Sequence, residues 1–82
     1  MTIFSYEMSD TEAIKLIKQA LLSIPVAILQ DKGISLVAGG PGITAKVTCQ
    51  NGKCITEGKL LGKMMEATVS SKIEMIAGFK KQ

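Results

Sequence analysis

The chain has 82 residues, of which 46% are hydrophobic and 21% are charged, and its net charge at pH 7 is +3. This length allows one domain over residues 1–82 with a modest core, and the composition excludes a disordered or collagen-like chain. Because there is no His, no Trp and no Arg, and only two Cys, most of the side chains that build catalytic or metal sites are missing.

The first elements predicted along the chain are a short strand over residues 2–6 and a helix over about residues 10–23. Ser9 and Glu12 have the spacing of a capping box, which marks a helix start. We expect Pro25 to end the helix, because a proline disfavours helical geometry in the residue before it. Apolar residues at three- and four-residue spacing form the predicted buried stripe: Ala13, Ile14, Ile17, Ala20, Leu21 and Ile24.

Strands follow over residues 26–30 and 34–38, joined at Asp31, Lys32 and Gly33 as a hairpin turn. The segment 43–50 alternates strictly between apolar and polar residues, which is typical of a half-buried strand. Its predicted inner face carries Ile43, Ala45, Val47 and Cys49.

Asn51 and Gly52 form the strongest short hairpin signal in the sequence, because both tolerate the positive φ of a type I′ turn. A two-residue turn fixes the register of the two strands that it joins. The predicted partners are Gln50 with Lys53, Cys49 with Cys54, Lys46 with Glu57, and Ile43 with Leu60.

The last third of the sequence is ambiguous. Ser71 and Glu74 repeat the capping-box spacing and favour a helix over about residues 71–80. A longer helix beginning near Gly62 and a fifth strand through residues 62–69 are the alternatives. Together the elements predict an α+β fold, in which an antiparallel meander of four or five strands packs on the N-terminal and C-terminal helices.

Cys49 and Cys54 would face each other on the inner side of the hairpin, within disulfide range. The favoured interpretation is two small buried thiols, since a cytoplasmic protein keeps its cysteines reduced. A disulfide is the second interpretation. Half of a metal site is the third, and it would need ligands from a second subunit because the chain has no His.

Catalysis is not expected. Most of the acidic residues are explained by helix starts, turns, caps and an ion pair, and a nucleophilic Cys would have no His as its base. The glycines at 39–42 lead into a strand, where a dinucleotide fingerprint would need a helix. We predict no cofactor and no metal.

Basic charge is concentrated in the second half of the chain, where seven lysines stand against three acidic residues. Such an excess favours an anionic partner, and nucleic acid is the obvious candidate. The absence of Arg and the small number of aromatic residues make this case weak. The candidate anion-facing residues are Lys46, Lys53, Lys59, Lys63, Lys80 and Lys81.

Flexible apolar side chains gather near the C-terminal end. Met64, Met65 and Met75, together with Phe79, could line an adaptable surface for an apolar partner. The alternative is that they fill the core.

The chain resembles the small proteins of the polyhydroxyalkanoic acid system, which are associated with storage granules. The correspondence lies in the helix TEAIKLIKQALLS, the meander from Ile24 to Leu60 and the segment SSKIEMI, and it covers most of residues 2–79. The resemblance implies a non-enzymatic protein at an apolar surface, built as a curved antiparallel sheet against helices.

The function we predict is a non-catalytic interaction module that self-associates as a homo-oligomer and binds another protein or an apolar surface. A weak nucleic-acid binder and a small carrier of an apolar ligand are the alternatives. The opening residues lack the pattern of a secretory signal, and the longest apolar run is too short to cross a bilayer. We therefore expect a cytoplasmic protein without a transmembrane segment.

Overall fold

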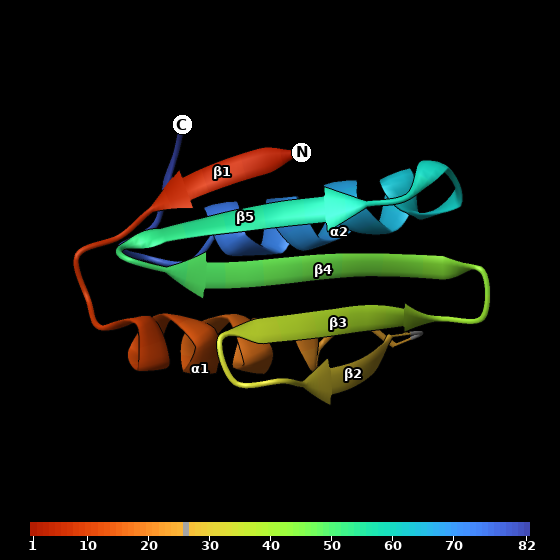
Figure 1. The fold of residues 1–82 in the computed structure, drawn as a ribbon, viewed down its shortest axis with the longest axis horizontal. Helices are drawn as coiled ribbons and strands as arrows, with labels where there is room; N and C mark the ends of the chain where they lie inside the picture. The colour runs from red at the N-terminus through yellow and green to blue at the C-terminus, as the bar shows by residue number, and fades with distance from the viewer. Residues whose placement is uncertain (26) are drawn as a thin grey trace.

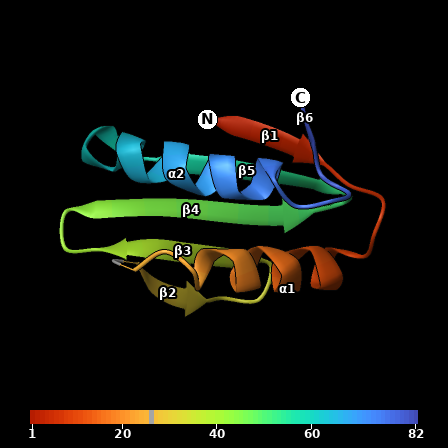
Figure 2. The same cartoon turned by 180° about the vertical axis from the view of Figure 1, so that it is seen from behind.

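Six strands form one antiparallel sheet, and both helices lie on the same face of it in the computed structural model, which describes residues 1–25 and 27–82 (Figures 1 and 2). The order across the sheet is β2-β3-β4-β5-β1-β6. The elements are β1 (Thr2–Ser5), α1 (Asp10–Leu21), β2 (Ile28–Asp31), β3 (Ser35–Gly40), β4 (Ile43–Gln50), β5 (Lys53–Gly58), the 3₁₀ helix η1 (Leu60–Gly62), α2 (Lys63–Glu74) and β6 (Lys80–Lys81). The predicted α+β class, with a sheet against two helices, is confirmed.

The N-terminal helix begins and ends close to the predicted positions. The Ser9 hydroxyl accepts a hydrogen bond from the backbone N–H of Glu12 at 3.2 Å, as the capping pattern predicts. Ala13, Ile14, Ile17 and Leu21 are buried, and they turn the apolar stripe of α1 toward the sheet.

The β4–β5 hairpin has the predicted turn. Asn51 and Gly52 have φ values of 55° and 79°, as a type I′ turn requires. Cys49 pairs with Cys54, as predicted. Lys46 pairs with Glu57 in register, although among the described residues no ion pair joins them.

The predicted pairing of Ile43 with Leu60 is wrong, because β5 ends at Gly58, which pairs with Ala45. Gly58 lies so close to Gly62 that a Cβ atom at residue 58 would stand 2.6 Å from the Gly62 carbonyl oxygen. The chain therefore leaves the sheet here and turns into η1.

The β2–β3 hairpin is also confirmed. Gly33 adopts a φ of 78°, and its backbone N–H donates to the Asp31 carboxylate at 3.1 Å. The other carboxylate oxygen of Asp31 lies 3.1 Å from Lys18 Nζ on α1. Val26, at which the first of these two strands was predicted to begin, lies outside the described residues.

The favoured prediction for the C-terminal helix is wrong in its bounds. The helix spans Lys63–Glu74, which matches the longer alternative, and Ser71 lies inside it instead of capping it. Met65, Val69 and Ile73, at four-residue spacing, pack against β4 and β5. Burial of this stripe outweighs the capping pattern at Ser71.

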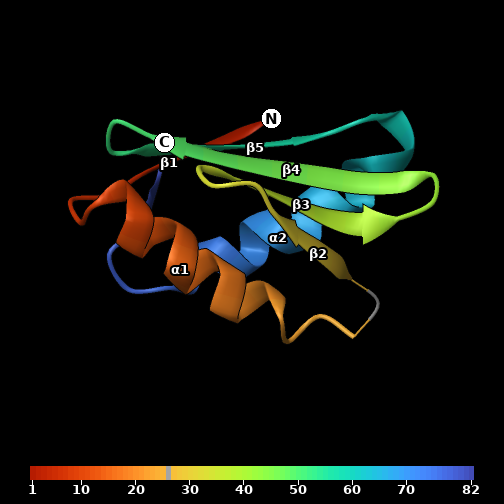
Figure 3. The same cartoon turned by 60° about the horizontal axis from the view of Figure 1, so that its bottom comes forward.

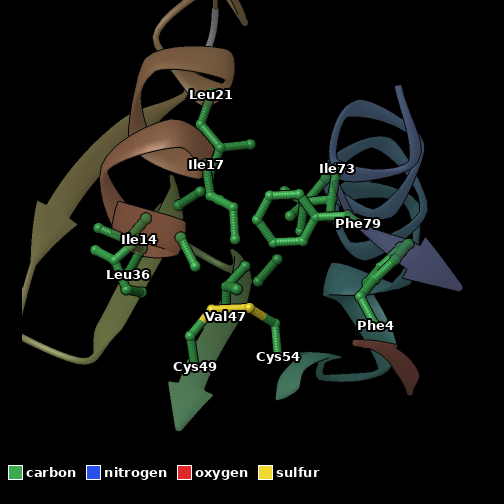
Figure 4. Close-up of a cluster of buried hydrophobic side chains, with 14 of the residues drawn as sticks. Phe4, Ile14, Ile17, Leu21, Leu36, Val47, Cys49, Cys54, Ile73 and Phe79 are labelled. Atoms are coloured by element: carbon green, nitrogen blue, oxygen red, sulfur yellow. A yellow bond between two sulfur atoms is a disulfide. The ribbon is translucent and has the colours of Figure 1, made fainter. Parts of the chain in front are cut away.

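The core lies between the sheet and the two helices, as the close-up in Figure 4 shows. The largest apolar side chains that are fully buried come from the sheet and from both helices: Phe4, Ile17, Leu21, Leu36, Val47, Val69 and Ile73. Thr56, which is fully buried, is satisfied by the Ser70 hydroxyl at 2.9 Å and the Thr2 carbonyl at 3.2 Å. This polar contact joins β5, α2 and β1.

The two ends of the chain lie side by side, because β1 pairs with both β5 and β6. The short strand β6 was not predicted. Figure 3 shows both helices beneath the sheet, so the opposite face is open in the part of the chain that the structure describes. None of the helices found in residues 1–25 and 27–82 has the length and apolar content needed to cross a membrane.

Candidate functional site: an exposed apolar tip

The residues predicted as an apolar partner surface fall into two groups. Met64 and Met75 are 85% and 82% exposed, whereas Met65 and Phe79 belong to the core. The prediction is therefore wrong for Met65 and Phe79. The Phe79 ring packs on the Tyr6 ring, with centroids 5.5 Å apart, and Met65 belongs to the buried stripe of α2.

Three large apolar side chains gather where β5 gives way to α2. Leu60 and Leu61 on η1 are 81% and 75% exposed, and Met64 follows in the first turn of α2. Residues three and four positions apart lie on one side of a helical segment. We call Leu60, Leu61 and Met64 the apolar tip.

The apolar tip is held on a rigid base. Gly62 is buried, and a Cβ atom there would lie 2.1 Å from the Thr44 carbonyl oxygen of β4. This close backbone approach fixes η1 against the start of β4. Ile43, the first residue of β4, is half exposed beside this contact. In Figure 1 the coil between β5 and α2 lies at the same end of the molecule as the β3–β4 turn.

Positive charge flanks the apolar tip. Lys59 and Lys63, which precede and follow η1, are both exposed. The nearest acidic residue along α2, Glu66, is buried, and its carboxylate lies 3.0 Å from the amino group of Met1. The tip therefore combines apolar side chains with two exposed lysines, of which Lys59 shares a surface hollow with the exposed Glu57.

The six candidate anion-facing lysines do not form one cluster. Lys59 and Lys63 flank the apolar tip, and Lys46 and Lys53 alternate with inward-facing residues and point to the open face of the sheet. Lys46 also lines one surface hollow together with Lys59. Lys80 and Lys81 form the edge strand β6, which lies toward the other end of the molecule in Figure 1.

Sequence reasoning missed Leu60 and Leu61 as surface residues. The sequence pattern pairs Leu60 with Ile43 on a continuing strand and indicates no surface role for Leu61. The signal that marks them is two adjacent leucines bounded by lysines, in the segment KLLGK, directly after a glycine at which the strand ends.

Cys49 and Cys54 form a disulfide, the second of the three interpretations of this pair. Their Cα atoms lie 4.0 Å apart across the hairpin, and both residues are fully buried. The favoured interpretation as two free thiols is not what the structure has. Figure 4 shows the sulfur bridge beneath Val47, within the core.

The carboxylate of Asp10 has a role beyond helix initiation. It accepts hydrogen bonds from the backbone N–H groups of Asn51 at 2.9 Å and Gly52 at 3.1 Å, and from the Tyr6 hydroxyl. These donors hold the pKa of Asp10 below its ordinary value, with the Tyr6 bond as the largest cause. Burial and the neighbouring Asp10 carboxylate raise the pKa of Tyr6. Asp10 thus ties the start of α1 to the β4–β5 turn.

We expect Asp10→Asn to destabilise the fold at neutral pH and to reduce its sensitivity to acid. The folded pKa of Asp10 is depressed, so its stabilisation is complete above the ordinary value of 3.8 and is lost as the pH falls through the lower folded value. Urea unfolding between pH 2 and 7 measures both effects. Glu12→Gln removes a charge from the same helical turn and is the control. Equal acid sensitivity in Asp10→Asn and the wild type would contradict this role.

Surface hollows of about 270 to 480 Å³ occur beside Val37, beside Asp10 and beside Ser5. Packed side chains occupy the space between sheet and helices. This packing does not favour carriage of an apolar ligand there. Among residues 1–25 and 27–82, no group of three or more Cys, Asp or Glu side chains is placed to hold a metal ion.

Comparisons of the chain with protein-family models, with curated proteins and with solved structures find no match. The resemblance to the granule-associated proteins stays a prediction.

Proposed function

We propose that the protein is a non-catalytic interaction module and that the apolar tip is its binding surface. The observation that carries this proposal is the exposure of Leu60, Leu61 and Met64, each of which is at least 75% accessible. The apolar stripe of α2, by contrast, is buried against the sheet. Transfer of one leucine side chain from water to an apolar partner contributes about 1.5 to 3 kcal/mol. Adjacent exposed residues of this size mark interaction sites more often than isolated ones do.

The bonding of three carboxylates supports a non-catalytic role. Asp10 is bound by two backbone N–H groups, Asp31 by Lys18 and the Gly33 N–H, and Glu66 by an amino group. Carboxylates held in this way stabilise the fold and are not free to exchange protons with a substrate. The resemblance to the granule-associated proteins also implies a non-enzymatic protein that acts at an apolar surface.

A cytoplasmic location is part of this proposal, although disulfides are uncommon in that compartment. Cellular reductants act on a disulfide through direct attack on sulfur, and access limits that attack. Because Cys49 and Cys54 are fully buried, the folded protein shields the bond.

We expect Leu60→Ser/Leu61→Ser to weaken binding to apolar partners at least tenfold while leaving stability within about 0.5 kcal/mol, since both leucines are exposed in the free protein. The measurements are fluorescence of an apolar dye added to native protein and light scattering over a range of protein concentrations. Light scattering also reports the self-association that the small size of the chain predicts.

The matched control is Met75→Ser, which removes an equally exposed apolar side chain at the other end of α2. It is expected to bind as the wild type does. A wild-type protein that is monomeric at every concentration and binds no dye would contradict the proposed function.

A further inference from the structure

We infer that the partner of the apolar tip is an anionic phospholipid surface; this rests on the proposed function and names the class of partner. Three features of the tip carry the inference: its outward shape, its lysine flanks and its rigid base.

The shape of the tip suits a deformable partner. Leu60, Leu61 and Met64 project from the end of the molecule with 75 to 85% of their surface accessible, so they do not line a groove that a peptide or helix could fill. A protein partner would need a pocket shaped to receive three adjacent side chains. A lipid layer accepts such side chains without a preformed pocket, because the acyl chains rearrange around them.

The charges match the headgroup layer. Lys59 and Lys63 directly precede and follow η1 in the sequence, and both are exposed. Their ammonium groups can therefore reach the phosphate and carboxylate groups of the headgroup layer when the leucines enter the acyl boundary. Lysine carries a compact charge on a flexible apolar stem, which lets the stem follow the leucines while the ammonium group stays among headgroups. Each lysine near such a surface strengthens binding by roughly fivefold.

The base prevents the tip from folding back. Gly62 lies against the Thr44 carbonyl and Met65 packs into the core, so η1 and the first turn of α2 keep their orientation when the apolar side chains leave water. Little conformational entropy is then lost on binding.

The experiment measures co-sedimentation of the protein with vesicles of phosphatidylcholine alone and with vesicles that contain phosphatidylserine. We expect binding to the mixed vesicles that weakens with added salt. Lys59→Gln/Lys63→Gln should reduce it by roughly fivefold for each lysine, and Leu60→Ser/Leu61→Ser by at least tenfold. The matched charge control is Lys80→Gln/Lys81→Gln, which removes the same charge from the edge strand β6 and should leave binding within twofold.

A second measurement reports insertion directly. The chain has no Trp, so Leu61→Trp places a single indole at the tip, and its emission should shift to shorter wavelength with the mixed vesicles. Absence of binding to these vesicles at low salt overturns the lipid assignment. If the tip variant still loses dye binding or self-association in that case, the proposed function stands with a protein as partner. An equal loss in the Lys80→Gln/Lys81→Gln control also overturns the assignment, because binding would then follow net charge alone.

Discussion

Replacement of Gly62 with alanine is expected to lower the free energy of unfolding by about 3 kcal/mol, at the upper end of what overpacking costs. The added methyl carbon would lie 2.1 Å from the Thr44 carbonyl oxygen and 3.1 Å from its carbon. Both are backbone atoms of β4, so no side chain can rotate to make room. An 82-residue protein has about 4 to 12 kcal/mol of stability in total, so this loss is large. Urea unfolding monitored by circular dichroism measures the loss.

Gly40→Ala is the matched control for this prediction. A Cβ atom at residue 40 meets no atom within 4 Å, and the residue does not have a positive φ. We expect this variant to be as stable as the wild type or more stable by up to about 1 kcal/mol, because alanine restricts the unfolded chain. Equal stability of the Gly62→Ala and Gly40→Ala variants would show that β4 and α2 tolerate separation at this point.

Reduction of the Cys49–Cys54 disulfide is expected to lower the free energy of unfolding by about 2 kcal/mol, the value for a loop of this short length. Comparison of urea unfolding with and without dithiothreitol measures the difference. Thiol alkylation of unreduced, denatured protein should label no cysteine, and reduction before alkylation should expose two. Because both residues are fully buried, reduction of the native protein should be slow and should require opening of the fold.

The variant Cys49→Ala/Cys54→Ala is the control, since reductant cannot change its stability. Two free thiols in an air-exposed sample of the wild type would contradict the disulfide. That result would favour the interpretation of Cys49 and Cys54 as two small buried thiols.

Local chemistry made part of the fold predictable. Ser9 marks the start of α1 because its hydroxyl accepts a hydrogen bond from the backbone N–H of Glu12, directly before the apolar stripe begins. Asn51 and Gly52 set the register in which Cys49 pairs with Cys54. In each case the deciding interaction lies between residues close in sequence. Such interactions can be recognised without knowledge of the tertiary structure.

The start of α2 could not be predicted in the same way. Gly62 precedes the helix and provides no side-chain cap, and the position depends on its backbone contact with Thr44, eighteen residues earlier. The capping pattern at Ser71 is a local signal that burial of the Met65 and Ile73 side of the helix overrides. The strand β6 had no signal either, since Lys80 and Lys81 become a strand only because β1 lies beside them.

The apolar tip was missed for the same reason. Leu60 and Leu61 lie between a strand and a helix. If the strand or the helix extended over both residues, its periodic pattern would place one of the two leucines on the buried side. Their exposure results from the early end of β5 at Gly58, which again depends on a contact that sequence spacing does not reveal. The anchoring of the β4–β5 turn by Asp10 joins residues about forty positions apart and is equally invisible in the sequence.

The position of β1 has a consequence for the order in which the molecule folds. Thr2 pairs with Thr56, so the first strand cannot join the sheet until more than fifty further residues have been synthesised. The β2–β5 meander consists of neighbouring hairpins, whose short loops close quickly. We therefore expect the meander to form first, and the docking of β1 against β5, which joins residues about fifty positions apart, to limit the rate of folding.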